Sequence, residues 1–343
     1  MRDGDWQFAY SASAPYPGCL LDFGRTPSGI YLLKEPETKF ADLDDTTTPL
    51  PGEDGVRMGR DYQRTVTVAL ELGVDTVDAP TTSYNYLYPA GGDSGQIGVG
   101  GPQASAGRPT LVRRAQWNEE AVGIVRTAWR ADAVRRRAGG VAWLRRQSAG
   151  RVRLLYGRPR KFAVVHEKFS DQGFTPLLVD FEAVDDKFYD NDEQRAELVG
   201  RANVPGPVWR PGRPGTPAGG TGERLVAGLN VGGRLATHPW ITFHGPGRNY
   251  VLTIDGLWTV QLNVDLAVGQ SVRLDSRSWS RAVWNIQTGG SVADKLTRSS
   301  PLLRDLLLHP GRHTARMQFS RRPGLTFVGP RIEIGWRNAH AWW

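Results

Sequence analysis

Residues 151–190 read RVRLLYGRPRKFAVVHEKFSDQGFTPLLVDFEAVDDKFYD and carry the clearest structural pattern in the chain. Apolar and polar residues alternate in 151–156 and again in 161–169, which predicts a hairpin with its turn at GRPR, residues 157–160. Residues 176–185 predict a third strand with one wet face, and three such strands in succession favour an antiparallel sheet. The buried face of that third strand would carry Leu177, Val179, Phe181 and Ala183.

The first 75 residues predict more strands. Short apolar runs at 6–10, 19–23 and 30–33 are separated by prolines and glycines, and 63–74 alternates cleanly. The stretch 35–55 is acidic and turn-rich, but its prolines and its threonine run break the ligand spacing of a calcium loop. We predict a solvated loop there.

Residues 78–109 are rich in Gly, Pro, Ser, Thr and Tyr and predict a long loop. Its glycine run around Gly98-Val99-Gly100 has neither the preceding strand nor the following lysine of a phosphate-binding loop. Long loops in compact domains are often functional, so we expect this one to reach a neighbouring subunit or another partner.

One long helix is predicted at 119–138. Asn118 suits the N-cap, two glutamates follow it at the positive end of the dipole, and Gly139-Gly140 would end the helix. The apolar stripe that should lie on the sheet consists of Ala121, Val125, Ala128 and Trp129. A sheet crossed by one helix makes the first domain α+β.

The second half of the chain predicts a different architecture. Of the 18 residues from 205 to 222, 11 are Pro or Gly, which marks a boundary or linker. We place the domains at 1–192 and 193–343, with a Pro/Gly-rich linker or loop at 203–222. Short alternating runs beyond it indicate a β-sandwich or jelly roll: 225–231, 239–244, 249–255, 257–264, 270–275, 281–287, 313–319 and 331–337.

Composition describes a water-soluble chain. It has 343 residues, 39% hydrophobic content and a mean hydropathy of −0.42, without an apolar run long enough to span a membrane. No secretory signal is visible, so we expect folding in the cytosol. The single cysteine, Cys19, excludes an internal disulfide or a cysteine-based zinc site, and its leucine neighbours predict burial.

The positive charge is local. Net charge is +8, yet residues 108–161 hold 15 basic and three acidic residues, an excess of +12, so the rest of the chain sums to −4. Basic clustering invites a nucleic-acid interpretation. We expect no sequence-specific binding of nucleic acid, because the sequence has neither interleaved exposed aromatic residues nor a recognisable nucleic-acid-binding motif.

A search for catalytic constellations yields no catalytic, metal or cofactor site. His309 and His313 stand four apart, but the Pro and Gly between them forbid a zinc-binding helix. His238 and His244 flank a predicted strand as ordinary half-buried residues. Acidic residues that could supply glycosidase carboxylates diverge along their strand, with Asp185 facing inward and Asp186 outward. The acidic group consists of Glu182, Asp185, Asp186, Asp190, Asp192 and Glu193.

The tryptophans of the second domain suggest that it could bind sugars, because exposed indoles on a β-sandwich can stack on sugar rings. We expect Trp258 and Trp284 in the core, since each shares its face with apolar residues. The terminal Trp342 and Trp343 should dock on the domain or on a neighbour. Further tryptophans of the second domain include Trp240, Trp279 and Trp336.

Seven stretches, in this order, resemble the distal tail proteins of long-tailed phages, in particular the minor tail proteins of phages that infect actinobacteria. They span nearly the whole chain, and their joint order carries the resemblance. They are YPGCLLDFG (16–24), PGEDGVRMGRDY (51–62), AWRADAVR (128–135), YGRPRKF (156–162), DFEAVDDKFYDN (180–191), WITFHGPGRN (240–249) and GQSVRLDSRSW (269–279).

The resemblance implies a structural virion protein and no enzyme or cofactor. In that family, first domains assemble as a six-membered ring that joins the tail tube to the tail tip or baseplate, and galectin-like sandwich domains project outward. The implied partners are further copies, the tail tube protein, tip or baseplate hub proteins and the tape measure protein. The implied location is the virion tail tip, assembled in host cytoplasm. An alternative is a tail-tip adhesin that binds glycans of the host envelope.

Overall fold

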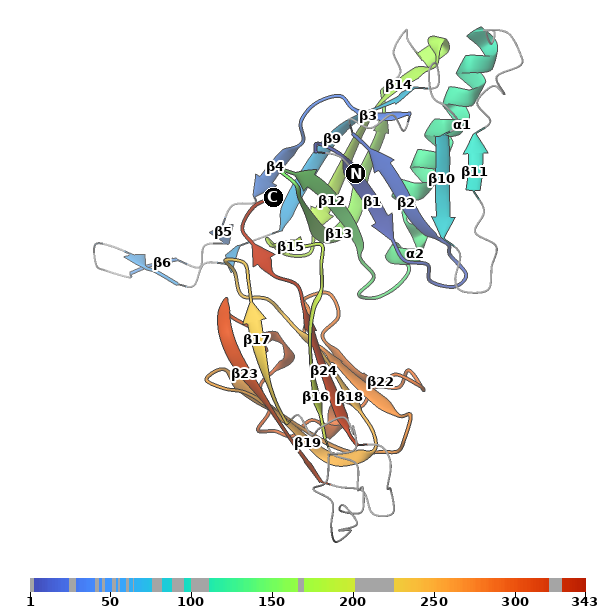
Figure 1. The fold of residues 1–343 in the computed structure, drawn as a ribbon. Coiled ribbons are helices and arrows are strands. Elements are labelled where there is room, and N and C mark those ends of the chain that lie inside the picture. The colour runs from blue at the N-terminus through green and yellow to red at the C-terminus, as the bar shows by residue number, and fades with distance from the viewer. Residues whose placement is uncertain are drawn as a thin grey trace. The chain divides into compact units, whose positions relative to one another are not determined.

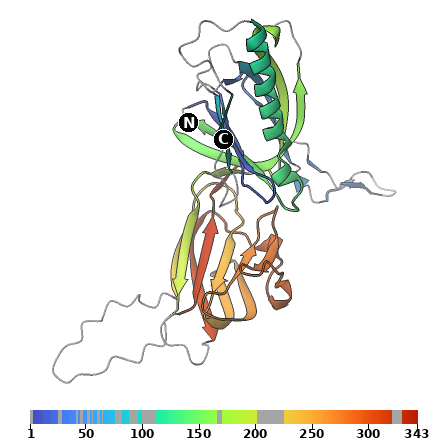
Figure 2. The same cartoon turned by 90° about the vertical axis from the view of Figure 1, so that its right-hand side faces the viewer.

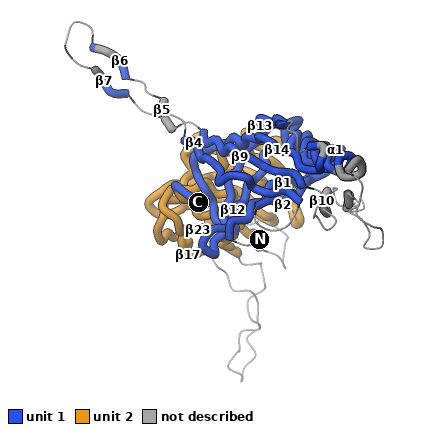
Figure 3. Tube along the Cα trace, turned by 90° about the horizontal axis from the view of Figure 1, so that it is seen from above, with its two compact units in different colours: residues 1–191, 341–343 blue, residues 192–340 orange. Residues whose placement is uncertain are grey.

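The computed structural model describes residues 3–24, 29–40, 43–44, 47–50, 54, 56–59, 62–63, 65–75, 82–87, 96–99, 111–165, 170–200, 225–320 and 329–343. The chain divides into two compact units (Figure 3). Unit 1 comprises Met1–Asn191 with Ala341–Trp343, and unit 2 comprises Asp192–His340. Each is mostly β, with antiparallel pairing, as the sequence predicted.

Unit 1 is built on one long antiparallel sheet (Figure 1). The strands run in the order β11-β10-β2-β1-β12-β13-β14-β9-β3, with β4 also paired to β9 and β15 to β13. Their bounds are β1 (Trp6–Tyr10), β2 (Gly18–Phe23), β3 (Ile30–Leu32), β4 (Glu37–Phe40), β9 (Val66–Asp75), β10 (Thr82–Leu87), β11 (Gln96–Val99), β12 (Ala142–Ser148), β13 (Arg151–Val164), β14 (Phe174–Ala183) and β15 (Phe188–Asp190).

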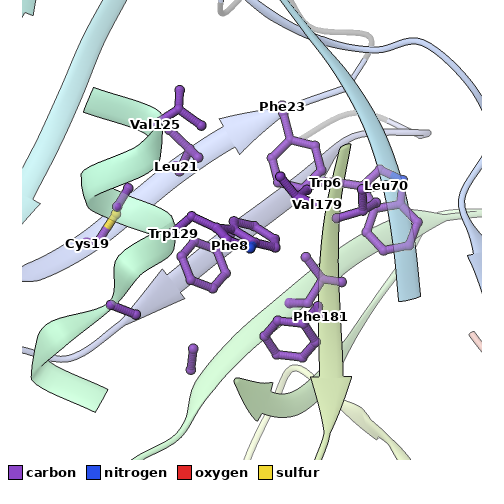
Figure 4. Packing of buried hydrophobic residues seen from close by; sticks show 14 of the residues in the cluster. Trp6, Phe8, Cys19, Leu21, Phe23, Leu70, Val125, Trp129, Val179 and Phe181 are labelled. Atoms are coloured by element: carbon purple, nitrogen blue, oxygen red, sulfur yellow. The ribbon is translucent and has the colours of Figure 1, made fainter. Parts of the chain in front are cut away.

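Helix α1 (Leu111–Arg130) covers one face of this sheet (Figure 2). The predicted stripe is confirmed, because Ala121, Val125, Ala128 and Trp129 are all buried. Trp129 lies beside Phe8 (Figure 4). Their ring centroids are 4.7 Å apart.

The predicted helix start was wrong. The helix begins at Leu111, so Asn118 is not an N-cap but a buried residue inside it. Its Nδ2 donates to the carbonyls of Val74 (2.8 Å) and Gly173 (2.9 Å), and its Oδ1 accepts from the Thr175 hydroxyl. A buried amide with satisfied partners ties the helix to the sheet ends, and the cap-like sequence around it was misleading.

The predicted helix end was also wrong. Ala131 adopts a left-handed conformation (φ 49°), which breaks the helix before the short α2 (Asp132–Arg135). A buried non-glycine residue in that region costs about 1 kcal/mol or more, which the surrounding packing must offset. Both ends therefore differ from the range 119–138.

The predicted hairpin turn at residues 157–160 was wrong as well. Strand β13 runs through it, and the real turn is Ala149-Gly150, where both residues have positive φ. Gly157 serves close approach instead, since a Cβ there would lie 2.2 Å from the carbonyl oxygen of Glu182. Pro159 sits at a register shift against β14, a position that tolerates its missing N–H. Strand β14 itself is confirmed, with Leu177, Val179, Phe181 and Ala183 buried.

Two predicted loops contain strands. Within 35–55, β4 pairs with β9, and short ladders join β5 (Leu43–Asp44) to β8 (Tyr62–Gln63) and β6 (Thr48–Pro49) to β7 (Val56–Arg57). Within 78–109, β10 and β11 extend the sheet, and Gly98 and Val99 lie in β11. The rest of 78–109 lies outside the described residues. These strands form through backbone pairing with neighbouring strands, rather than through the alternation of apolar and polar residues that predicts a strand.

Unit 2 is a β-sandwich of two antiparallel sheets, β16-β24-β18-β21-β22 and β17-β23-β19-β20, around one core. All eight strands predicted beyond residue 224 are present. A ninth, β16 (Gln194–Val199), was missed, and residues 203–222 lie outside the described residues. The bounds are β17 (Val226–Val231), β18 (Trp240–His244), β19 (Gly247–Ile254), β20 (Trp258–Leu266), β21 (Ser271–Asp275), β22 (Ala282–Asn285), β23 (Gly311–Ser320), β24 (Arg331–Trp336) and β25 (Ala339–His340).

Among the described residues, unit 2 has only three-residue 3₁₀ turns, at Ala293–Lys295 and Leu303–Asp305, beside its strands. Unit 1 adds one at Ser170–Gln172. Within the same described residues, none of the helices combines the length and apolarity that crossing a bilayer requires.

Gly157 and Gly123 provide a matched pair for testing the role of the β13–β14 contact. Gly157→Ala should lower the free energy of unfolding by about 1–3 kcal/mol, because its Cβ would overlap the backbone of β14. Gly123→Ala, on the exposed side of α1 with open space around it, should be neutral or raise stability by up to about 1 kcal/mol. Urea denaturation followed by circular dichroism measures both. Equal effects of the two substitutions would contradict the close approach at Gly157.

Candidate functional site

His309 and His313, which stand four residues apart, do not lie on a helix. His309 and His313 lie on either side of the start of β23, and the His313 ring nitrogen contacts the His309 carbonyl oxygen at 2.7 Å. His238 contacts the Leu306 carbonyl oxygen. Within the described parts of the chain, no group of three or more His, Cys, Asp or Glu is placed to hold a metal ion.

The acidic group divides into separate structural contacts. Asp185 lies just beyond the end of β14, and it accepts from the Tyr189 hydroxyl (2.7 Å) and the Lys187 amide (3.2 Å). Burial raises the pKa of Asp185, and burial followed by the nearby Asp185 raises the pKa of Tyr189. Glu182 pairs with Arg160 on β13 at 2.5 Å. These carboxylates brace strands and turns and do not converge as a pair for catalysis.

Several arginines of the basic region also brace the backbone. Arg158 donates to the carbonyls of Gly140 and Arg137, and Arg135 donates to the Pro159 carbonyl. Arg146 lies over the Trp6 ring at 5.2 Å. Part of the excess of positive charge in residues 108–161 therefore belongs to arginines that hold the backbone of unit 1 in place.

Arg135 and four further arginines form an exposed surface where α1 ends, which we call the basic patch. Its one acidic residue is Asp132, which pairs with Arg130 (3.1 Å) and Arg136 (3.8 Å). A surface with this excess of one sign attracts an acidic partner and steers its approach. The basic patch consists of Arg126, Arg130, Arg135, Arg136 and Arg137.

The two terminal tryptophans dock on unit 1, which confirms the prediction. Trp343 packs against Trp6 (centroids 4.9 Å apart) and Phe188 (4.6 Å). Trp342 lies beside Phe40 at 5.7 Å, yet 51% of Trp342 and 43% of Phe40 stay exposed. Trp343 therefore completes the core, whereas Trp342 and Phe40 form an uncovered aromatic pair.

A shallow pocket of about 290 Å³ opens over β4, β9 and β14. Its lining alternates in sign, with Lys34 between Glu37 (3.1 Å) and Glu71 (3.9 Å). Such exposed pairs contribute little to stability. The pocket is a polar surface of the strands at this end of the sheet, with Leu178 as its exposed apolar residue.

The outward face of the β16-β24-β18-β21-β22 sheet in unit 2 carries a row of polar side chains. On β18, Ile241 and Phe243 face the core, whereas Thr242 and His244 face outward. His244 contacts the Ser271 hydroxyl (2.8 Å), and burial lowers the pKa of His244. One residue from each strand lines up in register across the face: Glu197, Glu333, Thr242, Arg273 and Trp284.

The core prediction holds for Trp258 and fails for Trp284. Trp258 is buried and donates to the Leu307 carbonyl oxygen at 2.8 Å. On β22, Val283 faces the core and Trp284 is half-buried on the outward face opposite Arg273. This strand has apolar residues on both faces, so alternation alone chose the wrong one; the alternation of Leu274 and Arg273 on the neighbouring strand gives the correct one.

Three comparisons with known proteins gave one kind of match. No protein-family model and no curated protein matches the chain. Among solved structures, the chain is similar to the SPP1 Dit (gp 19.1) protein, described as a paradigm of the hub adsorption apparatus in phages that infect Gram-positive bacteria. The TM-score is 0.44 at 10% identity, over 90% of this chain and 91% of that one.

It is also similar to chains of the phage P2 baseplate in its activated conformation, with calcium and with strontium. The TM-scores are 0.45 and 0.46, each at 7% identity over 96% of this chain and 97% of that chain.

Cys19 should behave as a buried and unreactive thiol. Its burial raises its pKa to about 12, so on the order of 10⁻⁴ of it is thiolate at pH 8. We expect a thiol reagent to label the native chain orders of magnitude more slowly than the chain in urea, where the thiol pKa returns to about 8.5. Absorbance of the released chromophore measures both rates. Rapid labelling without denaturant would contradict the packing around β2.

Proposed function

We propose that this chain is a structural protein of a phage tail, located in the virion at the tail tip. In this proposal unit 1 closes a ring, with six copies, at the distal end of the tail tube, and unit 2 is carried by that ring. The ring would join the tail tube protein to tip or baseplate hub proteins and meet the tape measure protein. Support comes from seven sequence stretches in the family's order and from an α+β unit followed by a sandwich.

The observation that carries the proposal is that unit 1 has two unlike surfaces on different sides. The basic patch lies at the end of α1, whereas β3 and β4 form the far end of the sheet, beyond β9. Within the described residues, no strand pairs with the outer edge of β4 or β11, whereas Tyr31 of β3 forms a single bridge with Gly24. A closed ring needs a heterologous interface between two different patches on each copy, and open strand edges offer further pairing.

Charge reversal in the basic patch tests this proposal. The guanidinium groups of Arg126 and Arg137 have no ion-pair partner among the described residues, so Arg126→Glu with Arg137→Glu should leave the fold intact. We expect self-association to weaken at least tenfold, as measured by sedimentation, since each copy then repels an acidic partner surface.

The control is Arg298→Glu with Arg312→Glu, which makes the same change in net charge on exposed residues of unit 2. If both variants assemble as well as the native chain does, the basic patch is not part of the ring interface. Equal loss in both would show an effect of net charge alone. Copy number per purified particle tests location directly, and a chain absent from particles would overturn the proposal.

A second candidate is a glycan-binding adhesin, favoured by the outward face of the β16-β24-β18-β21-β22 sheet. Donors and acceptors alternate there, since Arg331 pairs with both Glu197 (3.2 Å) and Glu333 (3.1 Å), and Trp284 borders the row. A neutral lattice of donors and acceptors beside an indole suits hydroxyl-rich ligands, which both donate and accept hydrogen bonds.

Titration with host cell-wall polysaccharide separates this candidate from pure scaffolding. Binding should weaken at least tenfold in Trp284→Ala and stay unchanged in Trp279→Ala, whose indole instead lies beside Arg277. Isothermal calorimetry measures both affinities. No binding to the native chain, or equal loss in both variants, would count against a glycan site on this face.

A further inference from the structure

Carboxylates on and beside the outward face of the β16-β24-β18-β21-β22 sheet lie within ion-pair distance of arginines. Asp275 is almost completely buried, and its carboxylate accepts from Nε of Arg277 at 2.8 Å and from Nη2 as well. Its negative charge is therefore already matched within unit 2. The other pairs are Glu193 with Arg195, and both Glu197 and Glu333 with Arg331.

Arg273 is the arginine of this face that lacks such a partner. It lies on β21, in register with Thr242 of β18 on one side and with Trp284 of β22 on the other. Its guanidinium carbon is 4.1 Å from the centroid of the Trp240 ring. Among the described residues, none of the paired carboxylates comes within ion-pair distance of Arg273, and no acceptor takes a hydrogen bond from it.

The Trp240 indole holds this guanidinium in place. The ring lies against Gly335 of β24, where a Cβ would be 2.2 Å from it, and its Nε1 donates to Glu193 at 3.1 Å. The indole is therefore fixed by its own neighbours. Stacking on an indole uses the flat face of a guanidinium and leaves the N–H groups at its edge available to a ligand.

The surroundings of Arg273 favour an anion. Burial lowers the pKa of its guanidinium, and the positive charge of Arg277 lowers that pKa further, whereas Asp275 and Glu193 act in the opposite direction. A cation that is partly removed from water and has no ion pair gains from a bound anion, which replaces the lost hydration. One unpaired guanidinium matches one carboxylate, because a phosphate polymer is bound by several cations at once.

Trp284 adds an aromatic surface beside this guanidinium. It is half-buried on the same face and stands directly opposite Arg273 on the neighbouring strand. The Cβ atoms of such opposite residues are about 4.5–5.5 Å apart. In a uronic acid the carboxylate is bonded to the sugar ring itself. The ring can therefore stack on the indole while its carboxylate pairs with the guanidinium on the next strand.

We propose that Arg273 and Trp284 form a binding subsite for an acidic sugar, in which the guanidinium binds the carboxylate of a uronic acid residue and the indole binds its ring. Neutral sugars of the same glycan would meet the paired groups around Arg331 on β24. The inference rests on the glycan-binding candidate for this face and names its ligand class. The proposed ring does not depend on it.

Two tetrasaccharides of the same linkage separate the carboxylate from the sugar ring. One is β-1,4-linked glucuronic acid, and the other is cellotetraose, which carries a hydroxymethyl group in place of each carboxylate. Isothermal calorimetry on the full native chain should show binding of the acidic tetramer that is at least tenfold tighter. Equal affinities, or tighter binding of cellotetraose, would overturn the acidic subsite and leave the glycan candidate standing.

Two further outcomes also overturn the inference. Poly(glycerol phosphate) that binds as tightly as the acidic tetramer would show a site for any anion and not for a sugar. If neither tetramer binds, the acidic subsite falls, and the titration with host cell-wall polysaccharide then decides the glycan candidate separately.

Substitutions assign the two contributions to their residues. Arg273→Gln should lower the affinity for the acidic tetramer to that for cellotetraose and leave cellotetraose unchanged, because only the charge pair is lost. Trp284→Ala should weaken both tetramers by a similar factor. Arg312→Gln, which removes one positive charge from an exposed position on the other sheet, is the matched control and should change neither affinity.

A full preference for the acidic tetramer in Arg273→Gln would contradict the role of the guanidinium. Should that variant fail to fold, Arg273→Lys gives the same information, since lysine keeps the charge but lacks the two-nitrogen edge that pairs with a carboxylate. Arg273→Lys should lose at least part of the preference, and an undiminished preference there would overturn the inference.

Discussion

The packing of α1 on the long sheet is the interaction on which the rest of unit 1 depends. Val125 and Trp129 cover the strands on one face, and the buried amide of Asn118 joins the helix to the ends of β9 and β14. One helix thereby fixes the sheet at its centre, and among the described residues the outer edges of β4 and β11 pair with no further strand. A sheet with covered face and open ends is stable as a single copy and still offers edges to neighbours.

The packing of α1 on the sheet leaves two different surfaces on unit 1, one basic and one apolar. Arginines near the sheet centre brace turns and strands, as Arg158 does for Gly140, while those where α1 ends face solvent. At the β4 end of the sheet, Phe40 and Trp342 lie against each other and stay partly exposed. Unlike surfaces on different sides of one unit are what head-to-tail assembly requires, because identical patches would give a two-fold dimer instead.

Sequence patterns predicted the strands whose residues alternate between a core and water. All eight strands beyond residue 224 and the buried face of β14 followed from alternation and turns. Errors arose where backbone contacts decide. Gly157 has the sequence of a turn but serves close strand approach, Asn118 resembles a cap but bonds three distant groups, and Trp284 lies on a strand apolar on both faces. These depend on residues far away in sequence, which local patterns do not contain.

The central claim is that unit 1 is built to meet copies of itself head to tail. Analytical ultracentrifugation of the purified full chain over a hundredfold concentration range tests it most directly. The account predicts one closed oligomer of fixed stoichiometry that dissociates at high salt, because the interface joins opposite charges. A monomer at every concentration, or an open series of ever larger species, would contradict it.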